Sequence, residues 1–191
     1  MKRIVVFLSV VAVVTVSAAS LETVTLYPSQ SASVAGDSDG LPDARVLMQF
    51  DLASLPKGAI VEFAGLRLTD GVTVAWESDF VPVIVGALTS GWDESASWHG
   101  PAEGESWQSP GGDWDAKHTA YRVLVTKARV PAPFWMTEIV TAWLNGDVPN
   151  HGLVAMLEEG ADLADVAPNF NAETLKPSLE IRYLLPQTDQ R

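Results

Sequence analysis

The chain of 191 residues contains no cysteine, and this absence excludes two kinds of exported protein. A disulfide framework of the kind that holds many small secreted domains together is excluded. A lipoprotein anchor is excluded too, because that lipid is attached to a cysteine. A stable fold must therefore come from a hydrophobic core. The roughly 170 residues that follow the N-terminal apolar segment are enough for one domain with such a core.

Basic residues are also scarce. There are 12 Lys and Arg residues against 24 Asp and Glu residues, which gives a net charge of -12 at pH 7. A chain this acidic is not expected to bind nucleic acid or an anionic membrane through bulk electrostatics. The acidity is compatible with calcium, whose ligands in proteins are oxygen atoms.

Recognisable catalytic motifs are missing as well. His99, His118 and His151 are scattered without the spacing of a metal site, and no serine lies in a G-x-S-x-G motif. Jelly-roll polysaccharide lyases use Tyr, His and Arg side chains on one sheet. Here Tyr121 would point away from His118 and Arg122 on a strand. The sequence therefore predicts a protein without enzymatic activity, and a polysaccharide lyase or hydrolase is a remote alternative.

The one long apolar run lies near the N-terminus. Ile4 to Val16 follow the basic pair Lys2-Arg3 and precede the small residues Ser17-Ala18-Ala19. This order is typical of a secretory signal peptide, which we predict over residues 1–19. An uncleaved anchor is the alternative, but the run is shorter than the roughly 20 apolar residues of a membrane span. We expect a secreted protein, extracellular or in the cell envelope, with no membrane insertion after cleavage.

The rest of the chain has the pattern of an all-β domain over residues 20–186, followed by a short tail at 187–191. Pro82 suggests that the strand expected at 80–88 lies at an edge of its sheet or carries a bulge. One helix is expected from a Thr137 cap to Gly146, with Trp135 and Trp143 on its buried face. Short β-branched or alternating runs predict strands, with a possible hairpin return at 72–76 and loops at 28–42 and 158–177. The strands are expected at 23–27, 45–52, 59–69, 80–88, 120–126, 152–157 and 179–184.

A tryptophan-rich segment from Leu88 to Asp115 interrupts this pattern and holds four of the seven tryptophans. A tryptophan ring stacks on the apolar face of a sugar, and its indole N–H donates to a hydroxyl. Trp92 and Trp98 either bind sugar in this way or clamp the segment onto the sandwich. Trp107 and Trp114 lie in Ser/Gly/Pro-rich surroundings, and the sequence leaves two alternatives for them, exposure on a binding face or burial. Polar groups expected to assist sugar binding are Gln108, Asp113 and Asn150.

Acidic residues cluster at two places. Asp37 and Asp39 lie in the expected first loop, and Asp113 and Asp115 flank Trp114. No EF-hand spacing is present, and most acidic loops are simply solvated. The alternative is a structural calcium bound by these four carboxylates, since loops of a jelly roll converge at one end. No cofactor is otherwise required.

Four segments in order resemble the DNRLRE domain family. They are RVLMQFDLASLPKGAIVEFAGLRL (45–68), WDESASWHGPAEGESWQSPGGDWD (92–115), MTEIVTAWLNGDVPNHGLVAM (136–156) and LKPSLEIRY (175–183). The chain departs from the family pattern at Trp135, where the family has Asp before the helix. The resemblance implies a jelly-roll β-sandwich in a secreted protein. Some members are classed as carbohydrate-binding modules, with alginate-like polysaccharides among their ligands.

Two functional hypotheses of different kinds follow. The first is a secreted, non-catalytic polysaccharide-binding module that uses exposed tryptophans of the 92–115 segment. The second is a structural or adhesive protein with cell-surface or matrix partners and no small ligand, because a free sandwich can assemble through its edge strands.

Overall fold

A computed structural model describes residues 20–38, 41–68, 80–125, 132–158, 170–173 and 175–185. The predicted signal peptide, the possible hairpin return at 72–76, Asp39, most of the expected 158–177 loop and the tail lie outside these residues. In the part described, no helix combines the length and the apolar character that crossing a bilayer requires.

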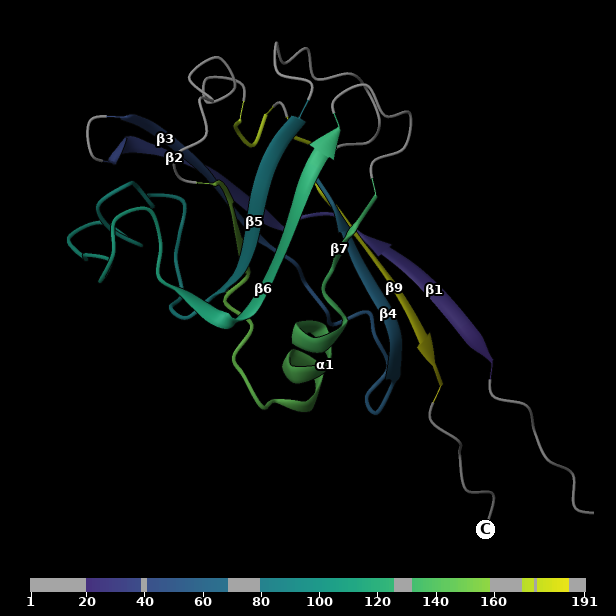
Figure 1. Cartoon of the computed structure of the whole chain (residues 1–191). Helices are drawn as coiled ribbons and strands as arrows, with labels where there is room; N and C mark the ends of the chain where they lie inside the picture. Colours follow the sequence, from purple (N-terminus) through teal and green to yellow (C-terminus); the bar gives the residue numbers. More distant parts are fainter. Residues whose placement is uncertain are drawn as a thin grey trace, which may run out of the picture.

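The fold is the predicted jelly-roll β-sandwich with one short helix. Two antiparallel sheets have the strand orders β1-β9-β4-β7 and β2-β3-β8-β5-β6 (Figure 1). The chain crosses repeatedly from one sheet to the other, as a jelly roll requires. The four-stranded sheet contains β1 (Leu21–Leu26), β4 (Ile60–Arg67), β7 (Phe134–Trp135) and β9 (Ser178–Leu184). The five-stranded sheet contains β2 (Gln30–Ser38), β3 (Leu41–Gln49), β5 (Phe80–Leu88), β6 (Trp114–Val125) and β8 (Leu153–Leu157).

The hydrophobic core lies between the two sheets. Every second residue of the strands points into it, so the period of two in the sequence determines which residues fill this core. Phe50 and Phe170 are among its largest fully buried side chains. Strand residues in this core include Val46, Met48, Ala64, Leu66, Val83, Val85, Leu153, Ala155, Leu179 and Ile181.

Helix α1 (Thr137–Asn145) adds Ile139, Val140 and Trp143 to the core. Gly146, with φ 77°, ends the helix in the left-handed conformation that favours glycine, as predicted. The predicted Thr137 cap is wrong. The cap position is Met136, and the Thr137 hydroxyl instead accepts a hydrogen bond of 2.9 Å from the backbone N–H of Ala64. This bond ties the helix to β4.

Two expectations about strands are corrected, and a third is met in one of its two alternatives. The expected loop at 28–42 holds β2 and the start of β3, which form a nine-residue antiparallel pairing. Small polar residues are tolerated there because β2 is an edge strand. Strand β6 begins at Trp114 rather than near Ala120, with a register shift opposite Gly86 and Ala87. The Pro82 strand is not an edge strand, because β5 lies between β8 and β6, but it carries the alternative feature, the register shift at Gly86 and Ala87. Pro82 itself falls just beyond the last pair of β5 with β8, Val83–Leu157.

Candidate functional site

The tryptophan-rich segment packs onto the outer face of the five-stranded sheet and forms a second, smaller core there. Trp98 and Trp107 are only 7% and 6% exposed. Trp92 and Trp114 are half-buried against the same cluster. The strand residues beneath them are Val34, Leu47, Leu88, Val154 and Met156. The five-stranded sheet is thus covered on both faces, by the main core and by this segment.

Trp98 is held from three sides. The Arg45 guanidinium lies 4.8 Å from the ring centroid, and Arg45 also pairs with Asp43 at 3.0 Å. A Cβ atom at Gly36 would clash with the Trp98 ring, and one at Gly111 would lie 2.7 Å from it. The two glycines therefore leave the space that the indole fills, which indicates a structural role for Trp98.

Two indole N–H groups of this segment bind backbone oxygens within the protein. Trp107 Nε1 donates to the Ser97 carbonyl at 2.9 Å, and Trp92 Nε1 donates to the His151 carbonyl at 3.0 Å. The Trp114 ring lies against Gly86, where a Cβ would be 3.0 Å from it. Exposure of Trp107 on a binding face is therefore wrong, because burying a large aromatic ring on the apolar sheet is more favourable than leaving it in water.

The polar residues expected to assist these tryptophans stabilise turns. Asp113 accepts hydrogen bonds from the backbone N–H groups of Gln108 and Ser109 at 2.9 and 2.7 Å, while the Gln108 side chain is exposed. Asn150 donates to the Phe50 carbonyl at 3.0 Å and accepts from the N–H of Gly152 at 3.1 Å. The structure therefore does not gather Gln108, Asp113 and Asn150 around one exposed ring.

Two of the carboxylates proposed for calcium, Asp113 and Asp115, already accept hydrogen bonds within the protein. Both Asp113 oxygens accept backbone N–H groups, and Asp115 accepts from Lys117 N–H and contacts His118 Nδ1, each at 2.8 Å. The Lys117 N–H bond, with His118 second, lowers the pKa of Asp115. Asp39 and the side chain of Asp37 lie outside the described residues. No group of three or more His, Asp or Glu residues suited to a metal occurs in the described ranges, and calcium stays a prediction.

A different surface combines an exposed tryptophan with charged partners: the outer face of the four-stranded sheet. Trp135 is 73% exposed and pairs with Gly65 of β4. The prediction that Trp135 packs in the core on a helix face is wrong, since the helix begins two residues later and Trp135 belongs to β7. Its neighbour Phe134, which points the other way, occupies the core instead.

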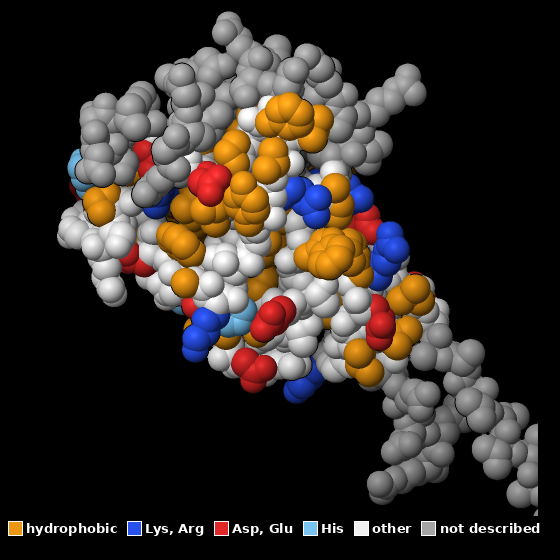
Figure 2. Space-filling model, viewed as in Figure 1, with side chains coloured by type: hydrophobic (Ala, Val, Ile, Leu, Met, Phe, Trp, Pro, Cys, Tyr) orange, Lys and Arg blue, Asp and Glu red, His pale blue; other side chains and the backbone are white. Residues whose placement is uncertain are grey.

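The row beside Trp135 runs across three strands. Phe63, Gly65 and Arg67 of β4 alternate with the buried Ala64 and Leu66, so they share the outer face. The same alternation puts Glu180 and Arg182 of β9, and Thr23 and Thr25 of β1, on this face. In register, Gly65 pairs with Glu180, which pairs with Thr25. Figure 2 shows basic and acidic side chains beside apolar ones over this side of the molecule.

The charges on this face hold one another in place. Glu180 lies 2.7 Å from Arg182 and 3.1 Å from Arg67, and the Arg182 guanidinium lies 5.3 Å from the Phe63 ring centroid. The hydrogen bond from Arg182 is the main cause that lowers the pKa of Glu180, with Arg67 acting in the same direction. The arginine side chains remain 52% and 28% exposed. Their guanidinium groups are thus oriented and still reach solvent.

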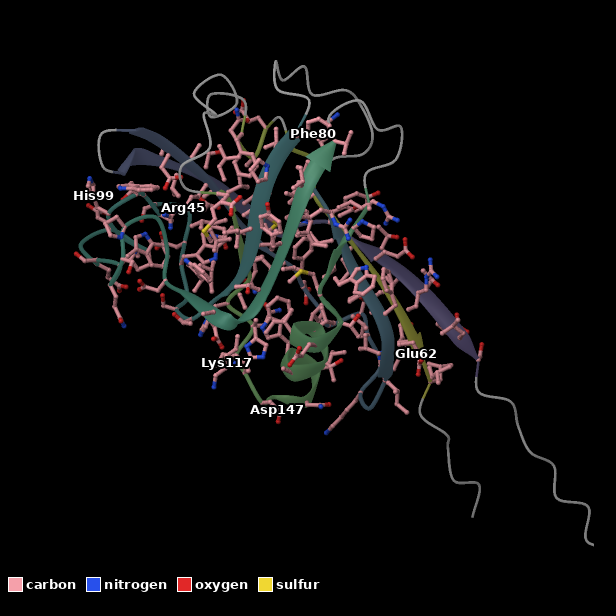
Figure 3. The ribbon with its side chains drawn as sticks, in the orientation of Figure 1. Arg45, Glu62, Phe80, His99, Lys117 and Asp147 are labelled. Atoms are coloured by element: carbon pink, nitrogen blue, oxygen red, sulfur yellow. The ribbon has the colours of Figure 1, made fainter. Side chains whose placement is uncertain are left out.

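The two surfaces lie on different sides of the molecule. Figure 3 labels His99 in the tryptophan-rich segment and Glu62 in β4, at opposite ends of the view. Sequence patterns missed the second surface because helical spacing of Trp135 with Ile139 favoured a helix face. The contrary signal was present: Pro131 and Pro133 favour extended chain just before Phe134-Trp135.

Comparison of the chain with protein-family models and with curated proteins gives no match. The resemblance to the DNRLRE family therefore stays a prediction.

Proposed function

We propose that this protein is a non-catalytic polysaccharide-binding module and that its ligand lies on the outer face of the four-stranded sheet. The observation that carries the proposal is Trp135, a tryptophan 73% exposed on an ordered strand. Covering such a ring with the apolar face of a ligand removes its area from water, which is favourable. The flat side of an indole matches the apolar face of a pyranose ring.

The surroundings of Trp135 supply what a sugar needs beyond stacking. Gly65, its cross-strand neighbour, has no side chain, and the Phe63 ring and Pro133 cover it, since a Cβ there would lie 2.5 and 2.9 Å from them. Apolar groups therefore continue from Trp135 across this part of the face. Arg67 and Arg182 offer guanidinium donors to hydroxyl or carboxylate oxygens. These side chains stand on paired strands rather than on loops, which keeps their spacing fixed before a ligand arrives.

An extended sheet face suits a polymer better than a small molecule. The row from Trp135 through Gly65 and Glu180 to Thr25 crosses the sheet. Its ends are open because Trp135 and Thr25 are both exposed. A surface that is open at both ends lets a long sugar chain continue beyond it. Such a surface therefore fits a polysaccharide rather than a monosaccharide. The predicted signal peptide agrees with a ligand met outside the cell or in its envelope.

The test is affinity gel electrophoresis of the purified protein in gels that contain neutral or uronate-rich polysaccharides. We expect retardation by at least one glycan. Trp135→Ala should weaken this binding about tenfold, equivalent to about 1.4 kcal/mol. Tyr121→Ala is the matched control, because Tyr121 is 56% exposed but stands on the other sheet, and it should bind like the wild type. Equal retardation of Trp135→Ala and wild type would refute the proposed face.

A structural or adhesive role is the second candidate, and the outer face of β5 and β6 favours it. Phe80 pairs with Val125 there, and Phe80, Tyr121, Val123 and Val125 are between 40% and 62% exposed. Figure 2 shows apolar side chains gathered over these strands. A surface of this kind suits a protein partner. If no glycan in the panel retards the protein while it associates in sedimentation experiments, this role replaces polysaccharide binding.

A further inference from the structure

Strand β1 is weakly anchored to the rest of the molecule. It lies at the outer edge of the four-stranded sheet, and among the described strands β9 is the one with which it pairs (Figure 1). Only Val24 and Leu26 reach the core, and both remain half-buried. The other four residues of β1 are exposed. The strand is therefore the least buried of the long strands in its sheet.

The link that follows β1 is short and crosses between sheets. Ser29 is fixed to the start of the five-stranded sheet, because its backbone N–H donates to the Gln49 carbonyl at 2.8 Å. Only Tyr27 and Pro28 then join the edge of one sheet to the edge of the other. Tyr27 is 71% exposed, and Pro28 has a fixed φ. A two-residue link of this kind is a hinge at which the chain either turns back or continues straight.

The site that β1 occupies matches the alternation of its own sequence. Leu179 and Ile181 of β9 are fully buried, and Leu26 and Val24 stand directly opposite them. If β1 leaves, the β9 edge exposes both a row of backbone hydrogen-bonding groups and this apolar pair. The β1 strand of a second copy restores the same pairing and the same packing, whereas another peptide must match the same alternation.

We propose that β1 is an exchangeable strand, so that two copies of this chain associate reciprocally, with the β1 of each paired to the β9 of the other. Exchange of an identical element forms a dimer at little cost, because each β1 meets the same β9 residues in the dimer as in the monomer. A short hinge favours this outcome, since the closed form alone must turn sharply. The inference does not depend on polysaccharide binding.

The absence of cysteine makes the test clean. Leu21 and Leu184 are opposite each other in register on β1 and β9. Their Cβ atoms are therefore expected about 4.5–5.5 Å apart, near the spacing that a disulfide needs. A tagged Leu21→Cys chain is mixed with an untagged Leu184→Cys chain at high concentration, incubated, oxidised and resolved on a non-reducing gel. Exchange predicts a tagged–untagged covalent dimer.

The matched control replaces Leu184→Cys by Ile60→Cys. Ile60 is 57% exposed and pairs with Leu184 from the β4 side, so it reports collisional crosslinking from the same row of the sheet. We expect several-fold more mixed dimer with Leu184→Cys than with Ile60→Cys. Equal yields at every concentration and incubation time would overturn the proposal.

A second variant leaves all strand residues unchanged. Insertion of three Gly/Ser residues after Pro28 relaxes the hinge, and we expect the dimer fraction in size-exclusion chromatography to fall while circular dichroism stays the same. An unchanged or larger dimer fraction would contradict the role of the short hinge and, with it, the proposal.

Discussion

Trp98 and Trp135 place the same side chain in opposite environments. Trp98 is 7% exposed between Arg45, Gly36 and Gly111, whereas Trp135 is 73% exposed on an edge strand. A tryptophan-rich sequence therefore gives no direct indication of where a binding platform lies. The partners of each ring decide that, and several of them, such as Arg45 and Gly36 for Trp98, come from strands distant in sequence.

The first prediction contrasts these two tryptophans. Trp98→Ala should lower the free energy of unfolding by about 3–5 kcal/mol, because it leaves a cavity over the sheet and an unstacked Arg45. Trp135→Ala should change it by less than about 0.5 kcal/mol, as expected for an exposed side chain. Urea denaturation followed by circular dichroism measures both. A larger loss for Trp135→Ala than for Trp98→Ala would reverse the assigned roles.

Gly36 offers a second test of the packing around Trp98. Gly36→Ala puts a methyl group into the indole ring, so we expect a loss of about 1–3 kcal/mol in unfolding free energy. Gly91→Ala is the control, since its Cβ would meet His151 at an ordinary 3.6 Å. If the two variants unfold at the same urea concentration, the ring is not where we place it.

Glu180 gives the protein a predicted pH dependence. Its pKa is lowered in the folded state by Arg182 and Arg67, so the ionised form stabilises the fold. This contribution is complete above the unfolded pKa of about 4.3 and is lost as the pH falls through the lower folded pKa. Glu180→Gln should therefore reduce stability at about pH 7 and bring it closer to the wild type near pH 3.

Urea midpoints across this pH range measure the difference between wild type and Glu180→Gln. Glu173→Gln, which changes an exposed carboxylate, is the control and should stay parallel to the wild type. A constant difference between wild type and Glu180→Gln at every pH would contradict the assignment.

At the scale of elements, the tryptophan-rich segment acts as a cover for a sheet. Thr89 N–H donates to the Asp113 carbonyl at 3.0 Å, so β5 and β6 already meet at its base. Replacing residues 90–112 by Asn-Gly should close a tight hairpin there. It should also expose apolar residues such as Leu47 and Val154.

We expect the shortened protein to bind a hydrophobic dye, to associate at lower concentration and to lose at least about 3 kcal/mol of stability, the cost of removing one buried tryptophan. Dye fluorescence and urea denaturation measure this. Gln108→Ala, an exposed change in the same segment, is the control. A shortened protein as stable and soluble as the wild type would show that the segment is not a cover.

The elements with strong alternation were predictable from the sequence. The run at 45–52 predicted most of β3, and Gly146 marked the end of the helix. Strand β2 was not predictable, because its Ser, Ala and Gly residues resemble a loop and only pairing with β3 makes them a strand. Strand β7 is two residues long, which is too short for any periodic signal.

The candidate site was less predictable than the fold. Its residues come from β4, β7, β9 and β1, and only the register of these strands brings them together. Arg67 and Glu180 are 113 positions apart in the chain. Sequence proximity instead drew attention to the acidic and aromatic residues at 92–115, which are close in the chain but are used for packing and turns.

At the scale of the whole molecule, the two sheets have different outer faces. The segment from 88 to 115 covers much of the five-stranded sheet, whereas the four-stranded sheet presents Trp135, Arg67 and Arg182 to solvent. The exposed edge strand β1 borders that same sheet. We therefore assign both ligand binding and strand exchange to the four-stranded sheet. An exchanged dimer would carry two binding faces, and two linked faces attach more strongly to a polymer than one.

The most direct test of the central claim is an NMR titration of the seven indole N–H signals with the glycan that retards the protein most. Comparison with Trp135→Phe assigns the Trp135 signal by its disappearance. Our account predicts that this signal shifts saturably while those of Trp98 and Trp107, assigned in the same way, stay in place. Shifts of Trp98 or Trp107 with an unmoved Trp135 would contradict it and return the binding site to the tryptophan-rich segment.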